Sequence, residues 1–237
     1  MLASTIWERE LVEFVQRRRA LAIKLAFPAL IALPLLFSRA PLIYAASALT
    51  MLAAFTSAFG SAAVLSRERV AGLICRYRLL PVRPGRMLLE RLSTSAGIDF
   101  IQMLPVIVMV GIRHPGGASW WPALVLGSAA VLLAGNLLGA VVSTLSDSPG
   151  EVMLFVLIPL LPAFYLSGLF TPPQGPLLTV IAQLLPFSYL HEALLGSLGL
   201  ESPLTAWEAA LGAAGFVVGI LGLTGLLGRR VLESDPQ

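Results

Sequence analysis

The sequence contains little charge for its length. Only 12% of its 237 residues are Asp, Glu, Lys or Arg, whereas 57% are hydrophobic. Soluble domains carry about 25% charged residues, and they cannot hide this much apolar surface, because polar groups must cover the outside of the fold. This composition excludes a soluble globular domain and indicates that lipid solvates much of the chain.

Cysteine, histidine and lysine are scarce as well. The single cysteine, Cys75, cannot form a disulfide within the chain. His114 and His191 are far apart and have no cysteine or carboxylate at ligand spacing, so we predict no metal site. The single lysine, Lys24, is not part of a Gly-x-x-x-x-Gly-Lys loop that holds nucleotide phosphates. If ATP drives this protein, another chain must bind the ATP and its magnesium, and we expect no cofactor in this one.

What the sequence does contain is a set of long apolar segments. Six of them have the length and composition of transmembrane helices, and they comprise residues 21–37, 42–65, 88–112, 122–145, 152–170 and 206–228. The apolar segment 176–200 is broken by Pro186. We predict two short re-entrant helices there rather than a seventh span, since irregular backbone is tolerated where protein covers it. We thus expect an all-α fold in which residues 1–237 form one transmembrane domain.

Residues 5–19 have a different pattern. Apolar residues from Trp7 to Val15 follow one helical face, acidic residues lie elsewhere, and three arginines end the segment. Cations suit the last turn of a helix because they oppose its dipole. We predict an amphipathic helix that lies on the membrane surface; the alternative is a soluble docking helix.

The arginines are distributed unevenly between the predicted loops. With six spans and both termini in the cytosol, thirteen of them lie on the cytosolic side, and only Arg39 and Arg113 lie outside. This asymmetry follows the positive-inside rule, whereas a seventh span would place Arg229 and Arg230 outside. The net charge of +3 is concentrated in loops between apolar segments, so we expect no nucleic-acid partner. We predict a multi-pass protein of the inner (cytoplasmic) membrane.

Small residues recur at helical spacing in three of the spans. They are Ala54, Ala58 and Ala62 in the second span, Gly135 and Gly139 in the fourth, and Gly212, Gly215, Gly219 and Gly222 in the last. Small residues at such spacing let helix backbones approach closely in a membrane. We therefore predict that all three sets pack against neighbouring helices.

The longest polar loop, residues 66–87, is rich in arginine. Its central part, residues 68–82, has the pattern of a short helix that Pro81 ends. Leu73, Leu79 and Leu80 stand among the arginines, which offers a soluble partner both apolar contact and charge pairs. The alternative is a solvated basic loop that only fixes topology, and the number of arginines does not separate these two interpretations.

Polar side chains at membrane depth are few, and the main ones are Asp99, Gln102 and Asn136. Asp99 lies eight residues beyond Arg91, which is about 12 Å of helix rise. A carboxyl group at this depth is costly and by default indicates function, so the three residues are candidates for a substrate path. The alternative is a structural carboxyl group that joins helices, and Asn136 fits such a joining role well.

Two segments resemble the permeases of the ABC type-2 exporter family. Residues 68–92 read ERVAGLICRYRLLPVRPGRMLLERL, and residues 165–196 read YLSGLFTPPQGPLLTVIAQLLPFSYLHEALLG. The first is similar to the family's acidic-glycine pattern and Leu-Pro-Val turn before the third span. The second is similar to its Ser-Gly-Leu-Phe-x-Pro run followed by Leu-Pro-x-x-Tyr. Val70 and Ala71 depart from the family, which often has a second acidic residue before the glycine, so Glu68 is the only acid of this motif.

The resemblance implies a pair of such permeases, as a homodimer or a heterodimer, bound to two cytosolic ABC ATPase subunits and surrounded by membrane lipid. It implies a coupling helix in loop 66–87 that docks in a cleft of the ATPase. The residues implied for coupling are Glu68, Gly72, Leu73, Arg76, Arg78, Leu79, Leu80 and Pro81. Those implied for a re-entrant outer gate are Gly168, Phe170, Pro186, Tyr189 and Glu192.

We therefore expect ATP-driven export of a hydrophobic or amphipathic compound, such as a drug, an antibiotic or a lipid-like molecule. Export of a lipid-linked glycan or of haem is a related alternative. An intramembrane enzyme would need a cluster of acids or histidines at membrane depth, and Asp99, His191 and Glu192 are the only candidates. We name no catalytic residue and expect a transporter subunit. A channel or secondary transporter would show more intramembrane charge or duplicated halves.

Overall fold

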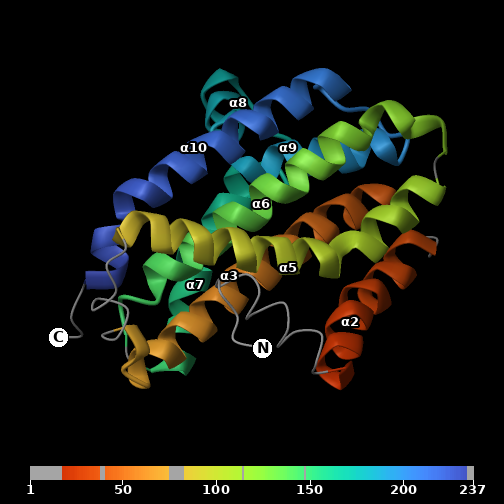
Figure 1. Ribbon diagram of the computed structural model, residues 1–237. Coiled ribbons are helices and arrows are strands. Elements are labelled where there is room, and N and C mark those ends of the chain that lie inside the picture. The colour runs from red at the N-terminus through yellow and green to blue at the C-terminus, as the bar shows by residue number, and fades with distance from the viewer. Residues whose placement is uncertain (1–17, 38–40, 75–82, 114, 147, 234–237) are drawn as a thin grey trace.

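The computed structural model describes residues 18–37, 41–74, 83–113, 115–146 and 148–233. Helices dominate this part of the chain and pack side by side in a bundle (Figure 1), so the predicted all-α fold is confirmed for it. The helices are α2 (Arg18–Phe37), α3 (Leu42–Val70), α5 (Pro84–Arg113), the 3₁₀ helix η1 (Pro115–Trp120), α6 (Trp121–Val142), α7 (Pro149–Leu166), α8 (Pro176–Gln183), α9 (Pro186–Ser197) and α10 (Ala206–Glu233). The predicted surface helix 5–19 lies almost wholly outside the described residues.

Four apolar helices are long enough to cross a membrane. They are Leu42–Val70, Pro84–Ile112, Ala118–Val142 and Ala206–Gly228. Two of the predicted spans contain shorter apolar helices, Ala26–Phe37 and Gly150–Leu166. The α8–α9 pair is apolar enough to count as one further span, but a bend of 94° separates its helices, as in a broken span or a re-entrant loop. The described chain is thus polytopic, and six spans with a re-entrant pair remain a prediction.

The centre of the bundle is the close contact between α3 and α6. A Cβ atom added at Gly139 would overlap the carbonyl of Ala58 and lie 2.9 Å from the nitrogen of Ala62, and one at Gly135 would lie 3.1 Å from the carbonyl of Ala54. The alanines spaced by four on α3 therefore face the glycines spaced by four on α6. The packing predicted for these two sets of small residues is confirmed.

The glycine set of the last span behaves differently. Only Gly212 meets a neighbour, the ring of Tyr189, whereas Gly215, Gly219 and Gly222 have no atom within 4 Å of an added Cβ. The predicted packing is wrong for these three glycines within this chain. The reason is that α10 lies at the edge of the bundle, where it turns much of its surface outward, including Val218 with 70% exposure.

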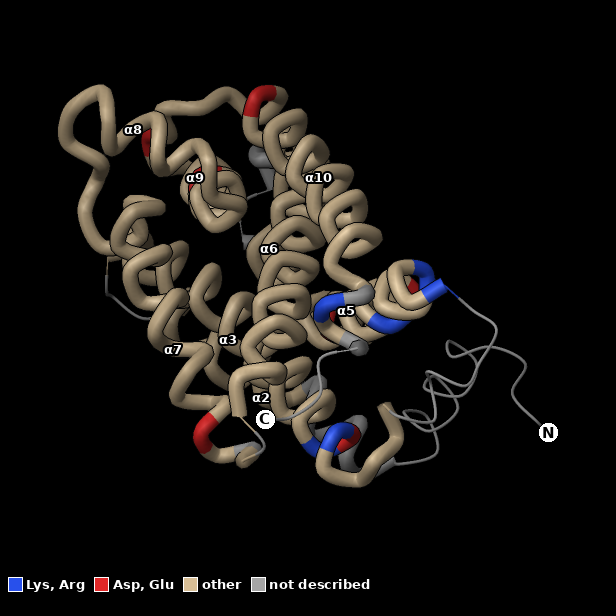
Figure 2. Tube along the Cα trace, turned by 90° about the vertical axis from the view of Figure 1, so that its left-hand side faces the viewer, with Lys and Arg blue, Asp and Glu red and all other residues tan. Residues whose placement is uncertain are grey.

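Charged residues mark the two ends of the bundle. In Figure 2, the described basic residues gather at one end, where α5 begins, together with several acidic residues, whereas acidic residues stand near α8, α9 and the start of α10 at the other end. We call the first the loop end, because residues 71–83 join α3 to α5 there (the α3–α5 loop). We call the second the α8–α9 end.

The α3–α5 loop is shorter than the predicted loop 66–87. Helix α3 continues to Val70, and α5 already begins at Pro84. Arg67 and Arg69 stand in the last turn of α3, where positive charge opposes the helix dipole and supports continuation of the helix beyond the apolar segment. Glu68 therefore belongs to the end of a long helix rather than to a separate loop helix.

Helix α9 is embedded at the α8–α9 end. It packs against α3, α6 and α10, and nine of its twelve residues are buried. Helix α8 contrasts with it, since Leu177, Val180 and Leu184 around it are exposed and Ala182 is its one buried residue. The pair therefore consists of one helix fixed in the bundle and one helix at its surface.

Candidate functional site

The base of the α3–α5 loop is closed by an ion pair. Arg91 Nη2 on α5 donates to Glu68 Oε1 in the last turn of α3 at 2.6 Å. Both side chains are mostly buried, with exposed fractions of 14% and 16%. A short, charge-assisted hydrogen bond of this kind, shielded from solvent, is stronger than a surface ion pair. The end of α3 and the start of α5 are thus held together beneath the loop.

A second contact ties the same base to α10. Arg69 Nη2 donates a hydrogen bond to the carbonyl oxygen of Val231, near the end of α10. On the other side of the loop, a Cβ atom added at Gly85 would overlap the carbonyl of Gly225, and one at Gly228 would overlap the backbone of Gly85. The chain therefore touches α10 both where it leaves α3 and where it enters α5.

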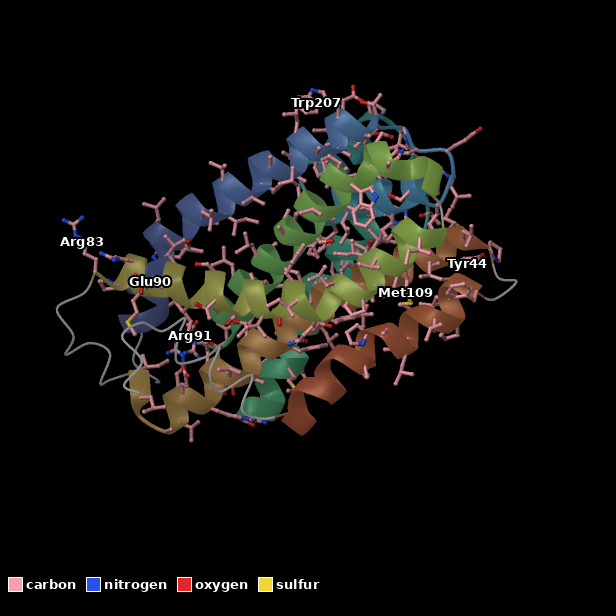
Figure 3. All side chains as sticks on the ribbon, turned by 45° about the vertical axis from the view of Figure 1, so that its right-hand side comes forward. Tyr44, Arg83, Glu90, Arg91, Met109 and Trp207 are labelled. Atoms are coloured by element: carbon pink, nitrogen blue, oxygen red, sulfur yellow. The ribbon has the colours of Figure 1, made fainter. Side chains whose placement is uncertain are left out.

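The described ends of the loop adjoin this base. Gly72 has φ of +69°, a left-handed conformation that glycine adopts without strain, and it ends α3. Leu73 is half-buried after that turn, and Arg83 extends away from the bundle before α5, whereas Arg91 points toward α3 (Figure 3). The other predicted coupling residues, Arg76, Arg78, Leu79, Leu80 and Pro81, lie outside the described residues.

The polar residues of the predicted substrate path come together in part. Asn136 Nδ2 on α6 donates to Asp99 Oδ2 on α5 at 2.8 Å, and also to the carbonyl oxygen of Leu132 at 2.9 Å. Asn136 is completely buried, Asp99 is half-buried, and Gln102 is buried one turn further along α5. The amide of Asn136 thus joins α5 to α6 at the carboxyl group, which favours the structural interpretation of both residues.

This geometry predicts how substitutions at Asp99 behave. Asp99→Leu removes the acceptor of a buried amide, which costs about 1–3 kcal/mol, so the yield of folded protein and its thermal midpoint should fall. Asp99→Asn keeps an acceptor oxygen and should preserve both. Asp99→Leu combined with Asn136→Leu should recover part of the loss. If Asp99→Asn is stable but lowers transport, the carboxyl group belongs to the substrate path instead.

At the α8–α9 end, buried serine hydroxyl groups donate hydrogen bonds to backbone carbonyl oxygens where the helices end. Ser47 Oγ on α3 donates to the carbonyl oxygen of Leu169 at 2.6 Å. Ser188 Oγ on α9 lies 2.6 Å from the carbonyl oxygen of Ala182 and 3.2 Å from that of Ser167. Carbonyls without partners are costly in a membrane. These hydroxyl groups therefore allow the chain to leave α7 and end α8 inside an apolar environment.

The predicted gate residues differ in burial and in the contacts that they make. Gly168 has φ of +79° and turns the chain out of α7, and Phe170 beyond it is exposed. Pro186 is the first residue of α9 and is buried, whereas Glu192 accepts a hydrogen bond from Ser202 Oγ at 2.8 Å in the segment before α10. Tyr189 lies between three helices: its hydroxyl group donates to the carbonyl oxygen of Gln183 at 3.0 Å, and its ring covers Gly212 of α10.

Several of these contacts could not be found from sequence patterns. Arg69 was counted only as a topology signal, although it reaches a carbonyl on the last helix. Ser47 and Ser188 are ordinary small polar residues within apolar segments, and the only signal for them is the broken helix that they support. Within the described part of the chain, no group of three or more His, Cys, Asp or Glu residues is placed to hold a metal ion.

Comparison with known proteins identifies the family. A search of curated protein sequences gives no match. The family model described as ABC-2 family transporter protein matches residues 39–228, which contain α3 to α9 and most of α10. This match covers well over half of the chain and includes both the α3–α5 loop and the α8–α9 pair, so it confirms the resemblance found in the sequence. The chain therefore belongs to the ABC-2 family of transporter proteins and is a multi-pass membrane component of a transporter.

Proposed function

We propose that the chain is the permease subunit of an ATP-driven exporter, with ATP hydrolysed by a separate subunit. The observation that carries this proposal is the braced base of the α3–α5 loop. Glu68 and Arg91 join α3 to α5, and Arg69 joins α3 to α10. A soluble partner that binds this loop can therefore move three helices together, which an unbraced topology loop would not allow.

The proposed assembly contains two permease chains and two ATPase subunits. In this proposal the chain has six spans with both termini in the cytosol, and the loop end is cytosolic because the described arginines gather there (Figure 2) and the positive-inside rule assigns such an end to the cytosol. The loop offers Leu73 as an apolar contact at its start and Arg83 as an exposed charge at its end. A cleft of the ATPase that accepts apolar anchors and carries acidic groups at its rim fits this pattern.

The proposed substrate is a hydrophobic or amphipathic compound that enters from the bilayer. Large apolar side chains on α5 and α7 face outward, including Ile112, Leu154 and Ile158. The described span residues offer few polar groups, and the amide of Asn136 and the carboxyl group of Asp99 already bond to each other. A strongly polar substrate would find little to replace its hydration along these helices.

The test is to co-purify the permease with a candidate ATPase and to measure both association and substrate-stimulated hydrolysis. In the double variant Leu73→Ala, Leu79→Ala, the loss of a central apolar anchor costs about 2 kcal/mol or more of binding, so association should fall by roughly 30-fold. Membrane insertion should remain normal, because both residues lie outside the spans.

Arg83→Ala is the comparison variant, since Arg83 is exposed at the end of the loop and a charge at the rim contributes less to binding than a central apolar anchor. It should change association by less than threefold. Wild-type association and hydrolysis in the double variant would mean that the loop only fixes topology, and the proposed function would lose its main support.

A further inference from the structure

Helix α10 touches both the base of the α3–α5 loop and the α8–α9 pair, the two regions to which the family resemblance assigns coupling and gate residues. It runs from the α8–α9 end to the loop end along the edge of the bundle (Figure 1). Near its start it contacts α9, near its end it contacts both anchor points of the α3–α5 loop, and along its length it packs against α6. Its outward face between these points has open space around Gly215, Gly219 and Gly222.

The contact at the loop end leaves little freedom for separate motion. Arg69 bonds to the carbonyl oxygen of Val231, and the backbones of Gly85 and Gly228 meet without side chains between them. One anchor lies just before the loop and the other just after it. Any displacement of the loop base therefore acts on the end of α10.

At the α8–α9 end, one aromatic residue of α9 contacts both α10 and the end of α8. The ring of Tyr189 lies directly on Gly212, and its centroid is 5.6 Å from that of Phe216, also on α10. Its hydroxyl group bonds to the carbonyl oxygen of Gln183, the last residue of α8. Tyr189 thus connects α10 to the exposed helix α8 through a single side chain.

We propose that α10 is the mechanical link that carries displacement of the α3–α5 loop to the α8–α9 pair, with Arg69 and Tyr189 as positioning residues at its two joints. This inference rests on the proposed function, since the displacement comes from the ATPase. It goes beyond that function by naming the helix through which the displacement passes. The loop moves the end of α10, α10 shifts along α6, and Tyr189 passes the shift to the end of α8.

The experiment reads the position of α8 without requiring a known substrate. In a Cys75→Ser background, which has no other cysteine, Leu184→Cys places a thiol at a site that is 67% exposed, directly after α8. The rate of its labelling by a maleimide is measured in the complex with the ATPase, before and after trapping with ATP and vanadate. Trapping should change the rate at least fivefold in the parent complex.

Arg69→Ala and Tyr189→Phe should each reduce this change to less than twofold while the ATPase still binds and hydrolyses ATP. Tyr189→Phe removes only the hydrogen bond to the carbonyl of Gln183. Because Tyr189 lies far from the loop end, this variant still tests the link if Arg69→Ala also weakens ATPase binding. Arg86→Ala is the control, because Arg86 at the same end is exposed and bonds to Glu90 on its own helix. It should leave the full change in labelling.

The outcomes separate this inference from the proposed function. If the ATPase binds and hydrolyses ATP but both variants keep the full change in labelling, the link through α10 is wrong and the function stands. The same holds if trapping leaves the labelling of the parent complex unchanged. If no ATPase associates with the parent chain, the proposed function fails and this inference fails with it.

Discussion

Replacing Gly139 by leucine should abolish most of the folded protein. A Cβ atom at this position overlaps the carbonyl of Ala58 and comes within 2.9 Å of the nitrogen of Ala62, and both atoms belong to the backbone of α3. Backbone cannot rotate away as a side chain can, so α3 and α6 must separate. Overpacking usually costs about 1–3 kcal/mol, and here it also removes the close contact that holds two membrane helices together. The yield of monodisperse protein after detergent extraction measures the effect.

Gly219→Leu is the matched control, because it makes the same change on another apolar helix. Nothing lies within 4 Å of an added Cβ at Gly219, so the yield should stay within a factor of two of the wild-type value. A loss at Gly219 equal to that at Gly139 would mean that the loss of yield does not report the packing of α3 against α6. It would instead place a neighbour against the outer face of α10.

Reversing the charge of Glu68 should produce the second large effect. Glu68→Arg removes a hydrogen bond to a charged group, worth about 1.5–3 kcal/mol, and places two guanidinium groups together in a mostly buried site. The thermal midpoint should fall by about 5–10 °C. Coupling of ATP hydrolysis to transport should fall as well, because the end of α3 is no longer held against α5.

The combined variant Glu68→Arg, Arg91→Glu restores opposite charges and should recover at least half of the lost thermal stability. Glu90→Gln is the control, since its ion pair with Arg86 is exposed, with 74% of the Arg86 side chain accessible, and such pairs contribute about 0–1 kcal/mol. A charge swap that is no more stable than the single reversal would argue against a direct ion pair as the source of the effect.

Local patterns in the sequence predicted much of the architecture. The length of the apolar segments indicated the long helices, and the alanines of α3 and the glycines of α6 each indicated close packing against a neighbouring helix, although not against each other. Asn136 was expected to join helices, and it bonds to Asp99 on the neighbouring helix α5. Each of these features is encoded within one or two turns of helix, where spacing has direct structural meaning.

Features that depend on distant partners could not be predicted. The bond from Arg69 to Val231 joins residues 162 positions apart, and no pattern near either residue indicates it. The glycines of α10 have the same spacing as those of α6, yet three of them face outward, because the position of a helix within the bundle is decided by all its neighbours. The boundaries of α3 and α5 also differed from expectation, since a helix can continue beyond its apolar segment.

The serine contacts at the α8–α9 end impose an order on biogenesis. When α7 leaves the ribosome, Ser47 is already available to bond to the carbonyl of Leu169, but Ser188, which approaches the carbonyl of Ser167, has not yet been synthesised. The backbone that follows α7 therefore has both of these hydrogen bonds only after α9 has been synthesised. Residues 149–197 should leave the translocon together, as one insertion unit, rather than helix by helix.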